Sequence, residues 1–145
     1  MYSRVLVPLD SSGLAEKAIP HATQIAKGLN VPIVLVRVID QVDPQLTDPQ
    51  HGLYLDQVSS SLRSNAQEYL NRVASSLRDE GLTVECEVHE GDVASRIIDQ
   101  AEMQPDTLIA MTTHGYSGVA RWVMGSVTDK ILRGSSNPVL VIRAD

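Results

Sequence analysis

The chain has 145 residues, of which 43% are hydrophobic and 21% charged, with 12 lysines and arginines against 18 aspartates and glutamates. This composition excludes a disordered chain and predicts one globular domain, over residues 1–145, that can bury a core. The net charge of −6 argues against nucleic acid as the main partner, because the chain lacks the excess of basic residues that neutralises a phosphate backbone.

The cysteine content and the hydropathy further restrict the class of protein. Cys86 is the single cysteine, so an intrachain disulfide and a cysteine zinc site are both excluded. The first residues lead directly into a strand-like run without the apolar core of a signal peptide. No stretch approaches the roughly 20 apolar residues of a membrane helix. We therefore expect a cytoplasmic protein with no membrane partner.

The first quarter of the chain predicts a strand followed by a helix. Residues 5–9 are apolar and end at a polar segment, Asp10–Ser12, whose side chains are candidate N-caps. Apolar residues then recur at helical spacing over residues 14–29. Pro20 falls inside this helix and should kink it or shift its start.

Residues 33–39 are almost continuously apolar, which is typical of a parallel strand covered on both faces. The stretch 41–52 has two prolines and no periodicity, and it is either a lid or a disordered connection. A long helix follows over residues 55–77, with Gly81 as its natural C-cap.

The second half of the chain continues the alternation of predicted strands and helices. Residues 83–88 alternate between apolar side chains and carboxylates, which is the pattern of an edge strand with one solvated face. Gly91 and Asp92 open a short helix. The last two strands are expected over residues 107–111 and 138–142.

Strands and helices that alternate in this way predict an α/β fold, a doubly wound, five-stranded parallel sheet with helices on both faces, similar to a Rossmann fold. If the charged third strand lies at an edge, the natural strand order is 3-2-1-4-5. Ligands of such sheets bind beyond the carboxyl ends of the strands, where the order reverses. Here those ends are Asp10 and the pair Met111–Thr112.

A glycine-bearing loop follows the fourth strand and leads into a helical pattern. Gly115 and Gly118 permit close backbone approach, and Gly125 precedes Ser126–Asp129, which resembles a capping box. The hydroxyl and amide of Ser126 and the amide of Val127 are therefore candidate phosphate ligands. The alternative, equally weighted on spacing alone, is that Ser126 caps its helix and the glycines make turns.

The loop also contains a histidine and an arginine. His114 is interpreted as a loop-shaping residue, because the sequence shows no recognisable catalytic partner for it and the four histidines have no metal-ligand spacing. Arg121 lies four residues before Gly125, within reach of a phosphate there, and its alternative is a solvated charge. We predict neither a catalytic residue nor a metal site made of side chains.

The whole chain resembles a universal stress protein. The resemblance rests on the first strand ending at Asp10, the turn over residues 91–94, His114–Gly115, Gly125–Thr128 and the closing strand over residues 138–142. Nucleotide-binding members of that family carry G-x-x-G, nine residues, and then G-S/T. Gly115, Gly125 and Ser126 match this motif, whereas Thr112 stands in place of the first glycine.

The resemblance implies a nucleotide site. Residues at the end of the first strand would border the nucleoside, Val38 would pack on adenine, Met111 and Thr112 would form the floor, and the loop would contact the phosphates. For Val38 and Met111 the alternative is plain core packing, and for Asp10 it is an N-cap. The predicted nucleotide-binding residues are Pro8, Leu9, Asp10, Val38, Met111, Thr112, His114, Gly115, Gly118, Arg121, Gly125, Ser126 and Val127.

By the same resemblance we expect a stress-responsive sensor that binds ATP, or ADP or AMP, with Mg²⁺ held through the phosphates. We also expect a homodimer that pairs through the exposed apolar edge formed by Val139, Leu140, Val141 and Ile142. One alternative is a family member that has lost nucleotide binding and acts as a protein-interaction module. Another alternative is an ATPase, which would be very slow because the sequence shows no clear general base to activate water.

Overall fold

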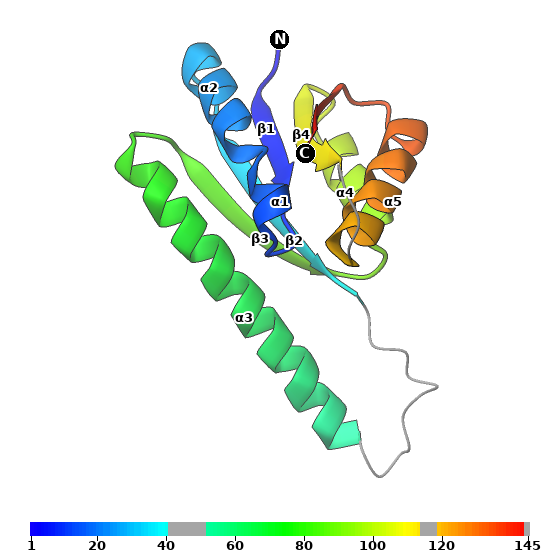
Figure 1. Ribbon diagram of the computed structural model, residues 1–145. Coiled ribbons are helices and arrows are strands. Elements are labelled where there is room, and N and C mark those ends of the chain that lie inside the picture. Colours follow the sequence, from blue (N-terminus) through cyan, green and yellow to red (C-terminus); the bar gives the residue numbers. More distant parts are fainter. Residues whose placement is uncertain (41–51, 114–118, 144–145) are drawn as a thin grey trace.

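Five parallel strands form one sheet in the order β3-β2-β1-β4-β5 (Figure 1). The computed structural model describes residues 1–40, 52–113 and 119–143, without the side chains of residues 52–56 and 119–124. The predicted fold class and strand order are confirmed, and the charged, alternating strand lies at an edge. The strands are β1 (Arg4–Pro8), β2 (Ile33–Ile39), β3 (Val84–Glu90), β4 (Thr107–Thr113) and β5 (Val139–Arg143).

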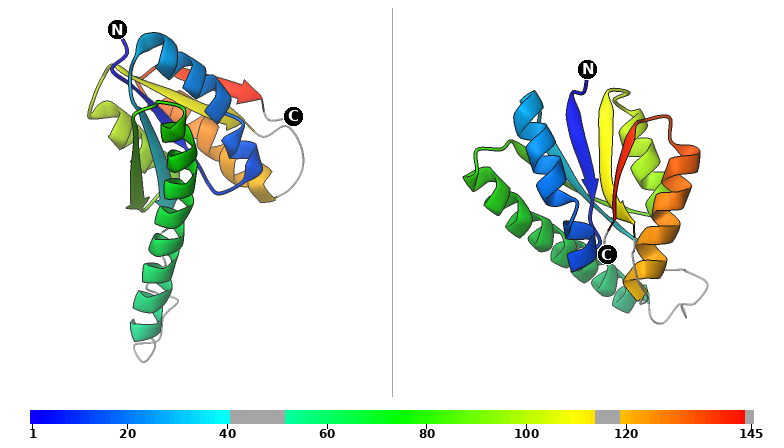
Figure 2. Two further views of the ribbon diagram at one scale, coloured as in Figure 1. Left: turned by 90° about the vertical axis from the view of Figure 1, so that its left-hand side faces the viewer. Right: turned by 45° about the horizontal axis from the view of Figure 1, so that its top comes forward.

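Helices cover both faces of the sheet (Figures 1 and 2). Helices α1 (Gly13–Glu16), α2 (Ile19–Leu29) and α3 (Gly52–Asp79) lie on one face, and α4 (Val93–Glu102) and α5 (Val119–Gly134) pack side by side on the other. The amino-terminal half of α3 extends beyond the sheet (Figure 2). Within the described parts of the chain, no helix has the length and apolar character needed to cross a membrane.

The turn between β1 and α1 is shaped by hydrogen bonds of its own polar residues. Ser12 is the N-cap of α1, and its Oγ accepts a hydrogen bond from the amide of Ala15 at 3.1 Å. The N-cap alternative for Asp10 is therefore wrong. The Asp10 carboxylate instead accepts from the amide of Ser12 at 2.9 Å, which shapes the turn itself. Pro20 lies in the first turn of α2, so the predicted shift of the helix start is confirmed, because proline is tolerated only there.

Two further helix ends also match their sequence signals. Gly81 has a φ of +90°, which favours glycine, and its amide donates to the carbonyl of Arg78 at 2.9 Å to close α3. Asp92 is the N-cap of α4, and its Oδ2 accepts from the amide of Ser95 at 3.1 Å.

Helix α5 departs from the prediction. It begins at Val119, seven residues before the expected start at Ser126, so the capping box is wrong and so is the alternative in which Ser126 caps the helix. The intervening residues include alanine, arginine and methionine, which are strong helix formers and extend the helix toward β4. Asp129 does not reach back along the helix but forms an ion pair with Arg133, with 3.2 Å between Oδ1 and Nε.

Candidate functional site

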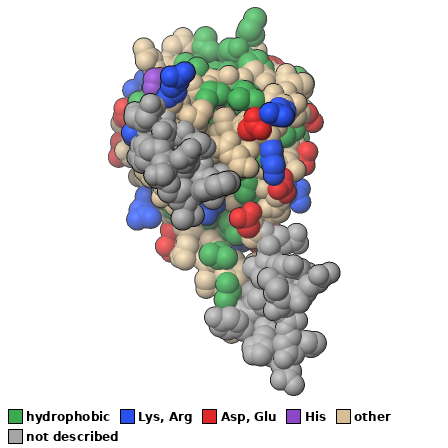
Figure 3. All heavy atoms as spheres, turned by 45° about the vertical axis from the view of Figure 1, so that its right-hand side comes forward, with side chains coloured by type: hydrophobic (Ala, Val, Ile, Leu, Met, Phe, Trp, Pro, Cys, Tyr) green, Lys and Arg blue, Asp and Glu red, His purple; other side chains and the backbone are tan. Residues whose placement is uncertain are grey.

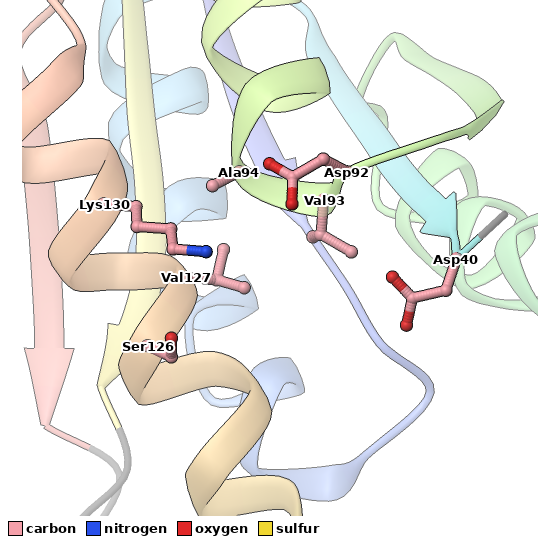
Figure 4. A pocket seen from close by; sticks show the side chains of 7 residues that line it. All are labelled: Asp40, Asp92, Val93, Ala94, Ser126, Val127 and Lys130. Carbon is pink, nitrogen blue, oxygen red and sulfur yellow. The ribbon is translucent and has the colours of Figure 1, made fainter.

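A pocket of about 260 Å³ opens between α4 and α5 at the carboxyl ends of the strands (Figure 4). This is the edge of the sheet at which ligands of doubly wound folds bind. Its volume lies just below the range of about 300–1,000 Å³ that is usual for small-molecule sites. The residues that line it are Asp40, Asp92, Val93, Ala94, Ser126, Val127 and Lys130.

The α4 side of the pocket is the first turn of that helix. Val93 and Ala94 line the pocket, and first-turn amides have no acceptor within their own helix. The Asp92 carboxylate accepts from both the amide and the Oγ of Ser95, the latter at 2.7 Å. These hydrogen bonds, and to a smaller extent the positive charge of Lys130, hold the pKa of Asp92 below its usual range.

The α5 side supplies a hydroxyl and an ammonium group. Ser126 and Lys130 are four residues apart, so they lie on the same face of the helix, with Val127 beside them. The buried Oγ1 of Thr128 donates to the carbonyl of Thr112 at 2.9 Å, and this bond ties α5 to the end of β4. The positions of the pocket residues on α5 are thereby fixed relative to the sheet.

Asp40 closes the pocket on the side of β2. It directly follows the last residue of that strand, is solvent-exposed, and turns its carboxylate toward the pocket (Figure 4). The sequence reasoning missed Asp40, Asp92, Val93, Ala94 and Lys130 as site residues. A usable signal existed for Asp40 and Asp92, because each follows a strand at its carboxyl end.

The other predicted site residues occupy different positions. Pro8 and Leu9 are buried and Asp10 is half-buried, while Val38 and Met111 belong to the hydrophobic core with 2% and 0% exposure. None of these five lines the pocket.

The glycine loop is described only in part. Gly125 is half-buried within α5, and Arg121 lies on the same helix without a described side chain. His114, Gly115 and Gly118 lie outside the described residues. So do residues 41–51 of the stretch 41–52, for which a lid and a disordered connection were both left open, while Gly52 begins α3.

Thr112 marks the departure from the glycine motif. The residue is 1% exposed at the end of β4, and its Oγ1 is buried with no hydrogen-bond partner among the described residues. An unsatisfied buried hydroxyl is unfavourable by about 1–3 kcal/mol. Thr23, Tyr69, Glu87 and His89 also have such an atom among the described residues, and each is a position that an ordered water or a ligand could satisfy.

The outer surface carries both signs of charge. Acidic and basic side chains are interspersed over the described part of the face drawn in Figure 3, and they form no continuous basic patch there. Among the described residues, no group of three or more His, Cys, Asp or Glu side chains is arranged to hold a metal ion.

Comparisons with known proteins agree with this architecture. The model of the universal stress protein family matches residues 1–143. Universal stress protein MJ0531 from Methanocaldococcus jannaschii is 31% identical, over 99% of this chain and 83% of the relative.

Solved structures share the fold. The structure of MJ0577 from the same organism superposes with a TM-score of 0.82 at 26% identity, covering 99% of this chain and 96% of that one. A universal stress protein from Arabidopsis thaliana, solved with AMP bound, has a TM-score of 0.66 at 15% identity, covering 99% and 92%. On the whole-chain family match and the relative at 31% identity, the chain belongs to the universal stress protein family.

Proposed function

We propose that this protein binds an adenine nucleotide at the carboxyl edge of its sheet. The observation that carries the proposal is the pocket between α4 and α5, which joins apolar walls to a hydroxyl, an ammonium and two carboxylates at the place where such folds bind ligands. The family membership supports it, as does the AMP bound by the Arabidopsis relative of the same fold.

The apolar walls suit the flat faces of a base or ribose, since Val93, Ala94 and Val127 present no charge to them. ATP with Mg²⁺ is the ligand that the glycine motif favours, and ADP or AMP would use the same nucleoside contacts. Mg²⁺ would be held through the phosphates. Thr112, with its unsatisfied hydroxyl at the strand end, would form part of the floor beneath the nucleotide.

Calorimetric titration of protein stripped of bound ligand tests this proposal, with ATP and Mg²⁺ and with AMP. We expect saturable binding of one nucleotide per chain. Ser126→Trp should abolish it, because the indole would fill a pocket of only about 260 Å³. Ser61→Trp is the matched control, since Ser61 is an exposed serine on α3, a helix that covers the opposite face of the sheet.

A protein-interaction module without nucleotide binding is the second candidate. Thr112 favours it, because a β-branched residue replaces the first glycine and its side chain is fully enclosed. The absence of heat with either nucleotide up to millimolar concentration would favour this candidate over the first.

The biological role proposed for the nucleotide-bound protein is that of a cytoplasmic, stress-responsive regulator that acts as a homodimer through β5. We expect ATP turnover to be weak or absent, because the sequence shows no recognised pattern of catalytic residues for activating water and, among the described residues, no side chains are grouped to hold a metal ion. Phosphate release measured during the same titration separates this role from that of a slow ATPase.

A further inference from the structure

We propose that Lys130 binds the phosphate next to the ribose of the nucleotide, together with Ser126, and so sets the direction in which the nucleotide lies in the pocket. This inference rests on the proposed function and adds a residue outside the glycine motif. It starts from the charge of the pocket, where Lys130 is the one cation among the described lining residues.

The Lys130 side chain is directed at the pocket. Figure 4 shows its Nζ extending toward the space bordered by Val127 and Asp92, not away along the helix surface. No acidic partner lies within ion-pair distance of it among the described residues, whereas Arg133, three residues further along α5, is paired with Asp129. Lys130 acts on the Asp92 carboxylate through its charge without forming an ion pair with it, so its ammonium group is available to an anionic ligand.

Ser126 adds a hydrogen-bonding group on the same face of α5, one turn before Lys130. Across the pocket lie Val93 and Ala94, whose first-turn amides also favour an anion. The Asp92 carboxylate is nearby and keeps its negative charge, which its hydrogen bonds to Ser95 stabilise and the positive charge of Lys130 offsets. The hydroxyl, the ammonium and the helix terminus together make this end of the pocket suitable for one phosphate group.

Asp40 lies at the opposite end of the pocket. It follows β2, whereas Ser126 and Lys130 lie on the helix that follows β4, and β1 separates these two strands in the sheet. Two strand spacings correspond to roughly 10 Å. A carboxylate repels phosphate and accepts from ribose hydroxyls or an exocyclic amine, so the nucleoside end of the ligand should face Asp40 and the phosphate should face Lys130.

The test compares AMP with adenosine, which differ only in this phosphate, by calorimetry on the full chain. We expect the wild type to bind AMP more tightly than adenosine. Lys130→Gln should weaken AMP binding about tenfold, the loss expected for one charge-assisted hydrogen bond, and leave adenosine binding unchanged. Lys130→Arg should retain most of the preference for AMP. Arg133→Gln is the matched control, because it removes one positive charge from an exposed position of the same helix that does not line the pocket.

Two results would overturn the inference while leaving the proposed function intact. One is unchanged AMP binding by Lys130→Gln, and the other is an equal loss for AMP and adenosine, which would indicate a general effect on the pocket. If wild-type protein binds no adenosine, AMP or ATP, the proposed function fails and the inference fails with it.

Discussion

Asn137 joins three segments of the chain through one side chain. Its Nδ2 lies 3.1 Å from the carbonyl oxygen of Ala101, 3.3 Å from that of Pro105 and 3.2 Å from that of Thr107, and the residue is 7% exposed. This amide therefore satisfies carbonyl groups at the end of α4 and the start of β4. No apolar side chain can replace it, because buried carbonyl groups need a donor.

We predict that Asn137→Ala lowers the free energy of unfolding by about 2 kcal/mol, the cost of leaving buried acceptors unpaired. Urea denaturation followed by circular dichroism measures the change. Asn71→Ala is the control, because Asn71 is exposed on α3 and bonds only to Gln67 among the described residues. Equal stabilities of the Asn137 variant and the wild type would contradict this account of the α4–β4 junction.

Among the helices and strands, α4 has an N-cap that makes the free energy of unfolding depend on pH. The Asp92 carboxylate accepts from the amide and hydroxyl of Ser95, and these bonds lower its pKa. A carboxyl group whose pKa is lower in the folded than in the unfolded state stabilises the fold above its unfolded pKa. That contribution is lost as the pH falls through the folded value.

We predict that Asp92→Ala destabilises the protein by about 1 kcal/mol at pH 7, as is typical for loss of an N-cap. The difference from wild type should shrink below about pH 4, near the ordinary pKa of an aspartate, because Asp92 of the unfolded wild-type chain takes up a proton there before Asp92 of the folded protein does. Urea denaturation at pH 7 and at pH 3 measures both effects. Asp99→Ala, an exposed aspartate on the same helix, should show no comparable loss. A pH-independent difference would rule out the charged cap as its cause.

The elements also show how far the sequence could predict this structure. The strand order followed from the alternating carboxylates of residues 83–88, because in a parallel sheet with helices on both faces an interior strand is covered on both sides, whereas an edge strand can keep one face in solvent. Gly81, Ser12 and Pro20 signalled their helix ends because each acts through local backbone chemistry. The start of α5 was missed because Ser126 is a good N-cap in isolation, and the residues before it are equally good helix formers.

The sequence predicted the edge of the sheet at which the pocket lies, but only part of its lining. Topology pointed to the carboxyl ends of the first and fourth strands, at Asp10 and Met111–Thr112, and these residues do not line the pocket. Ser126 and Val127, which do line it, were proposed from the glycine motif. Lys130 carried no signal, because a lysine on an amphipathic helix is ordinarily a solvated charge. Its position in the pocket depends on the orientation of α5 about its own axis relative to α4, and tertiary packing determines that orientation.

On the scale of the whole molecule, the two edges of the sheet differ in what they offer a second copy. The β3 edge carries Glu85, Glu87 and His89 on one face, and such charges discourage pairing. The β5 edge is half-buried and apolar over residues 139–142, and among the described strands β5 pairs only with β4. Strand pairing between two copies would satisfy the free backbone groups of β5 and cover its apolar side chains.

Val141 is the residue of β5 through which this dimer can be tested with least damage to the fold. Val139, Leu140 and Ile142 pack against the core, and among the described residues Val141 does not. We predict that wild-type protein sediments as a dimer at micromolar concentration and that Val141→Lys sediments as a folded monomer, because two ammonium groups would face each other across the paired strands. Leu29→Lys, at a 50% exposed apolar position on α2, should remain dimeric. A monomeric wild type, or a Val141 variant that stays dimeric, would exclude β5 as the dimer interface.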